Sequence, residues 1–444
     1  MRRCAKHIEK LSWIDEFVKN VRPYIFVRTE DNILIKRPNQ ATKINSTGAH
    51  ILKYLLDGGS INQLLKKTGE DKAEEIELFM LAVKFYLEGS LDEFSLNPAV
   101  GSSQFKLGFS KYPILSEFAL TYKCNLKCRF CYAGCNCTTN PISSNAELSL
   151  EDCYKVIDTI YQDAKVPSIS FTGGEPTLRK KELLGSIFYA HQLGMRVNLI
   201  TNGTLIDEEY GKLLLKAKLD TVQISIEGTT AETHDAIVGM KGAFEKSLNA
   251  IKVFQDLGIH VHTNTTLNKL NVEECLLMPQ FVKKLKLDRF SMNLIIPTGS
   301  SVVNNELVIT YSEVGNIIEQ VQSNSNLNNI DFMWYSPVPM CMFNSILQGL
   351  GNKGCAACDG LISVAPNGDV LPCASYDQSV GNIIHQPFKT VWDGVASSFF
   401  REKQFAHEIC KTCDQLALCN GGCPLYWRNQ GYEELYVVQK QTLS

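Results

Sequence analysis

The sequence predicts an α/β protein built around an incomplete parallel barrel of six β-α units, with a small module before it and a cysteine-rich region after it. Three observations support this prediction. Apolar strand-like runs alternate with amphipathic stretches over residues 115–330, residues 20–95 combine a hairpin pattern with helical stretches, and eight cysteines fall between Cys341 and Cys423. A chain of 444 residues is also too long for a single hydrophobic core.

The composition narrows the class of protein. Hydrophobic residues make up 44% of the chain and charged residues 20%, which is typical of a globular protein. The net charge of −3 provides no basic field for a nucleic-acid partner. The chain start lacks the apolar core of a signal peptide and no long apolar run follows, so we expect a cytoplasmic protein without a membrane span. In that reducing compartment, sixteen cysteines indicate metal ligands rather than disulfides.

Residues 20–95 predict a small winged-helix module. YIFVR (24–28) and NILIKR (32–37) are apolar runs joined by the polar turn TEDN, which is the pattern of a hairpin. Three helical stretches follow, the first capped by Ser46 or Thr47, the second starting after Ser60 and the third ending at Gly89. Residues 96–114 contain scattered Gly, Ser and Pro without periodicity, so we expect a linker there.

Residues 115–330 contain six strand candidates separated by amphipathic helical stretches. The candidates are SEFALTY, PSISFTG, RVNLITNG, TVQISIEG, HVHTNTTLN and RFSMNLIIP. Repeated β-α units with apolar strands predict a parallel sheet, and six units predict a partial (β/α)6 barrel of TIM-like design. Functional residues of such sheets gather at the carboxyl ends of the strands, so we expect the site in the loops that follow them.

A cysteine motif begins where the first of these strands ends. Cys124, Cys128 and Cys131 are spaced C-x3-C-x2-C. A 4Fe–4S cube normally takes four thiolates, so three would leave one iron open to a substrate or cofactor. Zinc or uncoordinated thiols are the alternatives for three clustered cysteines taken alone.

CNLKCRFCY, followed by TGGEPTL after the next strand, resembles the radical SAM superfamily. In that superfamily three cysteines hold a 4Fe–4S cluster whose open iron is chelated by S-adenosyl-L-methionine, and reductive cleavage of this cofactor yields a 5′-deoxyadenosyl radical. The resemblance implies the same cofactors here, with Cys124, Cys128 and Cys131 as the cluster ligands. No further residue identifies itself as catalytic.

The resemblance also implies contacts with the S-adenosyl-L-methionine. Tyr132 would lie near the adenine, and the remaining contacts would come from Gly173, Gly174, Glu175, Pro176, Asn202 and Ser225. Glycines allow close approach of the backbone to a ligand, and a carboxylate can accept from an ammonium group. For Asn202 and Ser225, ordinary turn positions are the alternative. Val238 occupies a position where the superfamily often has an arginine, so a carboxylate contact expected from that arginine is missing.

The cysteines of residues 331–444 resemble the SPASM domain, which usually carries two auxiliary 4Fe–4S clusters. The first cluster would take Cys355, Cys358, Cys373 and Cys423, and the second Cys410, Cys413 and Cys419. The superfamily places the last ligand downstream, but no cysteine follows Cys423. The fourth position is therefore open, filled by another group, or supplied by Cys341. A single cluster or structural zinc is the alternative. Cys135 and Cys137 are expected to be packed or exposed thiols, with a hydrogen-atom donor or persulfide as the alternative.

The first module resembles the PqqD-like precursor-recognition element, through ILIKRPNQATKINSTGAHILKYLLDGGSINQLL. Such a module can bind an extended leader peptide at a strand edge, and we expect residues 24–36 to offer that edge. A DNA-binding winged helix or a packing domain is the alternative.

Together the three regions predict a maturase for a ribosomally made precursor peptide. Hydrogen abstraction by the 5′-deoxyadenosyl radical would lead to a thioether or carbon–carbon crosslink, with an electron donor such as flavodoxin or ferredoxin. One alternative is a maturase that acts on a folded protein or a cofactor precursor. Another is a non-catalytic iron–sulfur or zinc protein with a regulatory winged helix.

Overall fold

The structure is a computed structural model that describes residues 11–101, 106–134 and 147–442. The chain divides into two compact units, Met1–Phe105 with Phe109–Ile114, and Lys106–Gly108 with Leu115–Ser444. Cys4, Cys135 and Cys137 lie outside the described residues. No helix in the described part of the chain is long and apolar enough to cross a membrane.

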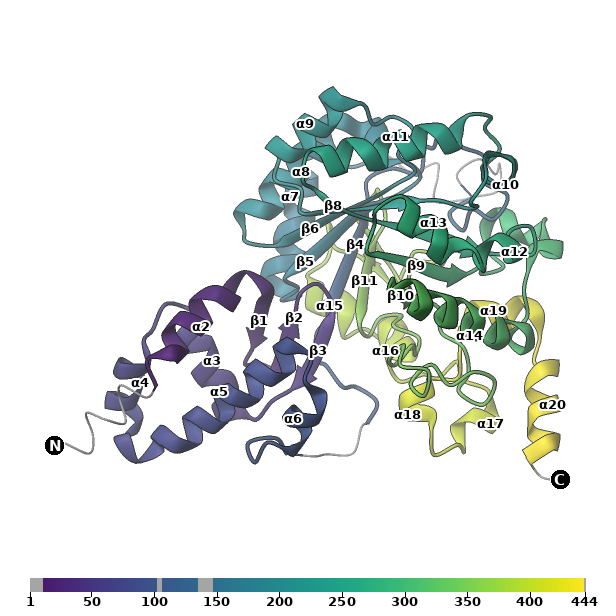
Figure 1. Cartoon of the computed structure of the whole chain (residues 1–444). Coiled ribbons are helices and arrows are strands. Elements are labelled where there is room, and N and C mark those ends of the chain that lie inside the picture. The colour runs from purple at the N-terminus through teal and green to yellow at the C-terminus, as the bar shows by residue number, and fades with distance from the viewer. Residues whose placement is uncertain (1–10, 102–105, 135–146, 443–444) are drawn as a thin grey trace. The chain divides into compact units, whose positions relative to one another are not determined.

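The first unit contains a three-stranded antiparallel sheet in the order β1-β2-β3 (Figure 1). The strands are β1 (Ile25–Arg28), β2 (Ile33–Lys36) and β3 (Gln40–Lys43), preceded by α2 (Trp13–Val21) and the 3-10 helix η1 (Arg22–Tyr24). The predicted hairpin is β1 and β2. The sequence reading missed β3 because its residues QATK are polar and half-exposed, without an apolar alternation.

Helices follow the sheet. They are α3 (Ser46–Leu56), α4 (Ile61–Thr68), η2 (Glu70–Lys72), α5 (Ala73–Glu88) and α6 (Leu91–Leu96). Ser60 caps α4 as predicted, and Gly89 ends α5 in the left-handed conformation at φ +82°. The cap of α3 is Asn45 rather than Ser46 or Thr47, because its extended backbone lets the Asn45 Oδ1 accept from the Gly48 N–H at 2.6 Å.

The second half of the expected linker is folded into the first unit. Phe109 and Ile114 pack against Ile33 and Ile35 of the central strand. The buried guanidinium of Arg28 donates to the Pro113 carbonyl at 2.6 Å. Residues 109–114 of the expected linker at 96–114 therefore belong to the first unit.

The second unit is built on a ten-stranded sheet in the order β10-β9-β8-β7-β6-β5-β4-β11-β12-β13. The six predicted strands are confirmed as β4 (Leu115–Ala119), β5 (Ser168–Thr172), β6 (Arg196–Thr201), β7 (Thr221–Ser225), β8 (His260–Leu267) and β9 (Arg289–Leu294), and all neighbouring pairs among them are parallel. The parallel α/β fold is thereby confirmed.

The sheet extends beyond the six predicted strands on both sides. β10 (Asp331–Trp334) pairs in parallel with β9, and β11 (Leu361–Val364) pairs in parallel with β4. β12 (Asp369–Leu371) and β13 (Gly381–Asn382) continue from β11 in antiparallel pairing. The cysteine-rich region therefore contributes strands to the same sheet as the barrel, next to the strand that leads into the cysteine motif (Figure 1).

Helices cover one face of the parallel strands (Figure 1). The helical elements of this region are α7 (Leu150–Asp158) with the π-helix η4 (Thr159–Asp163), η5 (Pro176–Arg179), α8 (Lys180–Gln192), α9 (Glu208–Lys216), α10 (Ala231–Val238), α11 (Ala243–Asp256), α12 (Val272–Cys275), α13 (Met278–Lys284), η6 (Gly299–Val302), η7 (Asn305–Leu307) and α14 (Tyr311–Asn328). Of these, η6 lies against the cysteine loop, where the Ser300 N–H donates to the Cys131 carbonyl at 2.9 Å. Buried apolar residues alternate along β6 and β7 with half-buried polar ones, for example Leu199 with Asn198. The apolar residues pack under the helices, and the polar residues occupy the opposite face.

The remaining chain forms short helices. They are α15 (Phe388–Trp392), α16 (Val395–Arg401), α17 (Glu408–Lys411), α18 (Leu416–Cys419), α19 (Pro424–Gln430) and α20 (Glu433–Thr442). An aromatic stack joins this region to the barrel helices, since the rings of Tyr311 and Tyr426 lie 3.7 Å apart between centroids. The Tyr311 hydroxyl also accepts from the Cys423 N–H at 3.0 Å, which fixes one cysteine of the region against α14.

Candidate active site and metal centres

The cysteine motif lies in the loop that directly follows β4, at the carboxyl end of the sheet. Cys124, Cys128 and Cys131 are all half-buried in this loop. Burial raises the pKa of Cys124 to about 11 and that of Cys128 well above its ordinary value, and mutual repulsion among the three thiols adds to both shifts. A bound metal would reverse this preference, because coordination deprotonates a thiol outright.

The cysteine loop rests on the carboxyl end of α10. The Lys127 N–H donates to the Val238 carbonyl at 2.9 Å, and the Arg129 N–H donates to the Ile237 carbonyl at 3.1 Å. The side chain of Val238 is buried and packs with Leu126 beneath the loop. At the position where the superfamily often has an arginine, this chain therefore has an apolar support for the cysteine loop.

Gly173 and Gly174 bring the end of β5 against the same loop. The Gly174 N–H donates to the Thr121 carbonyl at 2.7 Å, and the Glu175 N–H donates to the Lys123 carbonyl at 2.9 Å. A Cβ atom on either glycine would overlap this backbone, and Gly173 has φ +147°. Both positions thus require glycine because their backbone lies directly against the backbone of the cysteine loop. Their contact with the cofactor stays a prediction.

Glu175 is completely buried and connects the ends of β5 and β6. Its Oε1 accepts from the Thr177 N–H at 3.0 Å, the Thr177 hydroxyl at 2.5 Å and the Thr201 hydroxyl at 2.6 Å. Its Oε2 accepts from the Asn202 N–H at 2.9 Å, which leaves room at that oxygen for one further donor such as an ammonium group. Burial raises the pKa of Glu175, while its donors oppose the shift.

Asn202 connects β6 to the cysteine loop. Its Nδ2 donates to Asn125 Oδ1 at 3.0 Å, and Asn125 Nδ2 donates to the Thr204 hydroxyl at 2.8 Å. Sequence reasoning missed Asn125, Thr204 and Thr201. The signal for Asn125 was its place between two of the motif cysteines, where a polar side chain can bond to the next strand end.

The other predicted contacts are distributed around this edge. Pro176 is buried at the start of η5, and half-buried Tyr132 packs on an apolar cluster that includes Tyr122 and Leu371. Ser225 ends β7 in register with Asn264 of β8. The structure thus brings all the predicted contact residues to the carboxyl ends of β4, β5, β6 and β7.

Ser225 also belongs to a group of polar side chains on the open face of the sheet, which we term the polar row. Its members are Ser363, Glu117, Ser170, Asn198, Gln223, Ser225, His262, Asn264, Ser291 and Asn293. The members other than Ser225 bond from strand to strand, as in Asn264 Nδ2 to Asn293 Oδ1 at 2.7 Å and the Ser291 hydroxyl to Asn264 Oδ1 at 2.8 Å. Burial, with smaller effects of His260 and Arg289, lowers the pKa of His262 to about 4, so this imidazole is neutral at pH 7.

Glu117 carries the polar row toward the cysteine-rich region. Its Oε1 accepts from the Ser363 hydroxyl on β11 and from the Ala374 N–H at 3.2 Å. Ala374 directly follows Cys373, so this carboxyl group joins the open face of the barrel to one of the late cysteines. Burial raises the pKa of Glu117.

The late cysteines gather in two groups. Cys355 interacts electrostatically with Cys358, Cys373 and Cys423. The completely buried Nζ of Lys403 donates to the Cys355 carbonyl at 2.8 Å and to Asp359 at 2.9 Å, which holds this loop in place. The second group contains Cys410, Cys413 and Cys419.

Comparisons with known proteins decide the family. The model "Radical SAM superfamily" matches residues 118–278, and an iron–sulfur cluster-binding domain, SPASM, matches residues 355–414. An Fe-coproporphyrin III synthase of Methanosarcina barkeri is 30% identical over 332 residues, which cover 68% of this chain and 81% of that protein. The chain belongs to the radical SAM superfamily. It is an enzyme with S-adenosyl-L-methionine, a 4Fe–4S cluster with an open iron, and auxiliary 4Fe–4S clusters as cofactors.

Other similar proteins have peptide substrates in their names. A PqqA peptide cyclase of Rhizobium meliloti is 27% identical over 327 residues, 70% of this chain and 82% of that protein. The structure of Streptococcus suis SuiB bound to its precursor peptide SuiA has a TM-score of 0.65 at 19% identity and covers 91% of this chain and 95% of that one. This likeness shows the shared fold.

The donor set fits the radical SAM cluster. Among the described residues no three His, Cys, Asp or Glu side chains converge on a single metal ion. In a 4Fe–4S cube each thiolate binds its own iron, so the ligands surround the cube instead of meeting at one point. Cys124, Cys128 and Cys131 would hold the cluster, which when bound to S-adenosyl-L-methionine supplies the 5′-deoxyadenosyl radical.

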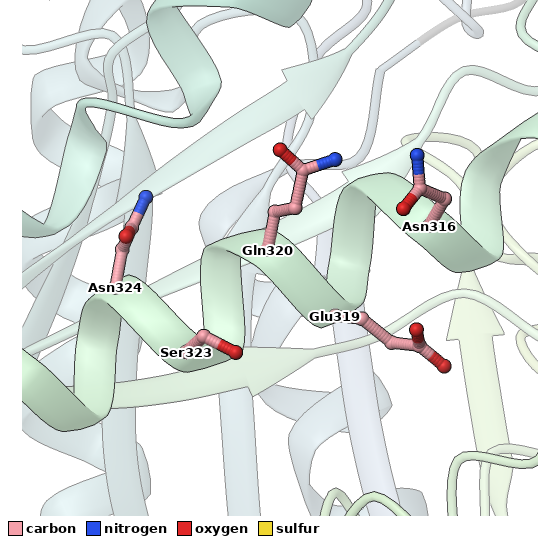
Figure 2. Close-up of a pocket in the computed structure, with 5 residues that line it drawn as sticks. All are labelled: Asn316, Glu319, Gln320, Ser323 and Asn324. Atoms are coloured by element: carbon pink, nitrogen blue, oxygen red, sulfur yellow. The ribbon is translucent and has the colours of Figure 1, made fainter.

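A polar hollow of about 330 Å³ on α14 is a separate feature. Figure 2 shows Asn316, Gln320 and Asn324 projecting from one side of the helix, and Glu319 and Ser323 from the other. It contains none of the cysteines and none of the predicted contact residues of the radical SAM site.

Proposed function

We propose that this radical SAM enzyme modifies a ribosomally made precursor peptide by forming an oxidative thioether or carbon–carbon crosslink. The observation that carries the proposal is the coverage of SuiB. The second unit makes up about three quarters of the chain. The likeness to SuiB covers 91% of the chain and therefore includes part of the first unit as well. By sequence, the heme-related proteins and the PqqA peptide cyclases alike match 68–71% of the chain, which the second unit alone could account for, so these matches do not separate the two substrate classes.

The polar row supports a peptide substrate. Its amide and hydroxyl side chains offer both donors and acceptors, which suits the amide groups of a peptide backbone. A porphyrin carries carboxylate groups that arginine or lysine would bind, and Arg289, the arginine near His262 of the row, begins β9 at the end of the sheet opposite the cysteine loop. Ser225 and Asn293 lie at or near the carboxyl ends of β7 and β9, on the edge of the sheet that carries the cysteine loop, so a peptide bound along the row would present side chains toward the radical.

The proposed reaction balances as follows. A substrate carbon loses a hydrogen atom to the 5′-deoxyadenosyl radical. The carbon radical would then bond to a cysteine sulfur or a second carbon of the peptide, which would lose a proton, and an auxiliary cluster would accept the remaining electron. The peptide loses two hydrogens in total. A flavodoxin or ferredoxin of the cytoplasm would reduce the first cluster.

The first unit would bind the leader segment of the peptide. Of the expected edge at 24–36 only β1 lies at an edge of the sheet, because β2 lies between β1 and β3 and is hydrogen-bonded on both sides. The sheet edges are β1 and β3. β1 is largely buried and packs on α3, whereas β3 is more exposed, so we propose β3 as the strand to which the leader adds.

Anaerobic incubation of the reconstituted enzyme with S-adenosyl-L-methionine, a reductant and the precursor encoded beside its gene tests the proposal. We expect the peptide to lose two mass units and the amides of β3 to gain protection from hydrogen exchange when the peptide binds. An unchanged mass with deuterium uptake from solvent would indicate epimerisation instead. Protection elsewhere would count against β3.

A tetrapyrrole substrate is the second candidate. AdoMet-dependent heme synthases and the Fe-coproporphyrin III synthase are 28–30% identical to this chain. The same assay with iron coproporphyrin in place of the peptide separates the two proposals. A mass change in the tetrapyrrole, with none in the peptide, would favour this second function.

A further inference from the structure

The second auxiliary site has three cysteines close together in sequence but needs four ligands. Cys410, Cys413 and Cys419 are spaced C-x2-C-x5-C, and the chain has no cysteine after Cys423. Cys423 belongs to the other group, since it lies in electrostatic range of Cys355 and its N–H is held by Tyr311. Among the cysteines of the given sequence, a fourth ligand for this site can come only from upstream of Cys410.

The segment that follows β10 lies against this site. The Met340 N–H donates to Cys419 Sγ at 3.3 Å. The ring of Pro339 comes within 3.0 Å of the point where a Cβ on Gly422 would lie, so the segment is packed closely on the loop that follows Cys419. Backbone N–H groups that donate to cysteine sulfur are a common part of iron–sulfur ligand loops.

Cys341, the next residue, lies near the same three thiols. It lies in electrostatic range of Cys413 and Cys419, and Cys410 in turn is in range of Cys341. The cysteines of the first auxiliary group have electrostatic neighbours among themselves. Of these described residues, none has Cys341 as such a neighbour. The eight late cysteines thus separate into two complete sets of four.

We propose that Cys341 is the fourth thiolate of the second auxiliary 4Fe–4S cluster and reaches it from the upstream side of the chain. Two consequences follow. Both auxiliary clusters have every iron bound by cysteine, so they exchange electrons and bind no substrate, and the only open iron belongs to the cluster of Cys124, Cys128 and Cys131. The second cluster also bonds the segment after β10, at the edge of the sheet, to α17 and α18.

The experiment uses the full chain with the first cluster removed by the substitutions C124A, C128A and C131A. After anaerobic reconstitution this background should hold about eight irons, two cubes of four. Adding C341A should lower the iron content and produce the EPR signal of a three-iron cluster in the oxidised protein, as C413A should. C153A, which removes a buried thiol of α7 outside both groups, should leave iron content and spectrum unchanged.

A conservative variant keeps the test decisive if C341A disturbs folding. C341S places an oxygen where the sulfur was. We therefore expect the second auxiliary cluster to keep its four irons and its reduction potential to shift. Iron content, EPR spectrum and both potentials equal to those of C153A, in both Cys341 variants, would overturn the proposal. That outcome would leave the peptide-crosslinking function untouched, because the test involves no peptide.

Discussion

The side-chain amide of Asn202 donates to Oδ1 of Asn125 at 3.0 Å, across 77 positions of the sequence. Asn125 stands between Cys124 and Cys128, and Asn202 directly follows β6 and donates its own N–H to Glu175. This bond makes the cysteine loop part of the rigid strand ends. A ligand loop held from several strands keeps its thiolates in place before the cluster binds.

We expect N125A to weaken the cluster loop. The substitution leaves the Asn202 amide without its partner, at a loss of about 1–2 kcal/mol in unfolding free energy. The first cluster should also lose iron to a chelator several-fold faster than in the wild type, which iron release followed by absorbance can measure. N326A on the exposed side of α14 is the control and should match the wild type. Equal release rates in all three proteins would contradict the prediction.

Removing any single ligand of the first cluster should abolish cofactor cleavage. Three thiolates already leave one iron open, and two cannot hold the cube in a defined position. C124A, C128A and C131A should each yield no detectable 5′-deoxyadenosine under dithionite, as measured by chromatography. C275A, which alters a buried thiol of α12, should retain cleavage. Undiminished cleavage in any member of the trio would refute its role.

Alanine at Gly174 should disrupt the site more than alanine at an unobstructed glycine. At Gly174 a Cβ would overlap the backbone of Lys123, whereas at Gly258 nothing lies within 4 Å. G258A introduces only the strain of a positive φ, about 1 kcal/mol. G174A should lose about 2–3 kcal/mol in denaturant unfolding and reconstitute with less iron in the first cluster. The prediction is wrong if G174A is no less stable than G258A.

His234 should make stability fall in mild acid. Its buried Nδ1 accepts from the Glu227 N–H at 3.0 Å, and burial lowers its pKa from 6.5 to about 4 despite the nearby Asp235. The unfolded chain therefore binds more protons between pH 6.5 and pH 4, so the unfolding free energy drops as pH falls through this window, by at most about 3 kcal/mol.

H234N is the matched variant for this prediction, because its side-chain oxygen can still accept from the Glu227 N–H but does not titrate. We expect chemical denaturation at several pH values to show a flatter dependence between pH 6.5 and pH 4 in H234N. If both proteins lose stability in parallel, another group is responsible.

Much of the site followed from local sequence. The cysteine spacing, the glycine pair and the six apolar strands are short-range patterns, and each can be recognised within a single segment of the sequence. Parallel strands bring their carboxyl ends to one edge, so the position of the site also followed from the strand count. Polar β3 escaped detection because such a short edge strand needs no apolar alternation.

The partners of these patterns depended on tertiary structure. Sequence alone predicted Cys124, Cys128 and Cys131 as the ligands of one cluster, and showed that eight later cysteines are available for other sites. Only the fold decided that β10 and β11 extend the barrel sheet, that Val238 supports the cysteine loop, and that Cys341 lies with Cys419 and not with Cys355. Contacts between residues far apart in sequence depend on how the segments pack, and the spacing of residues along the chain does not predict that packing.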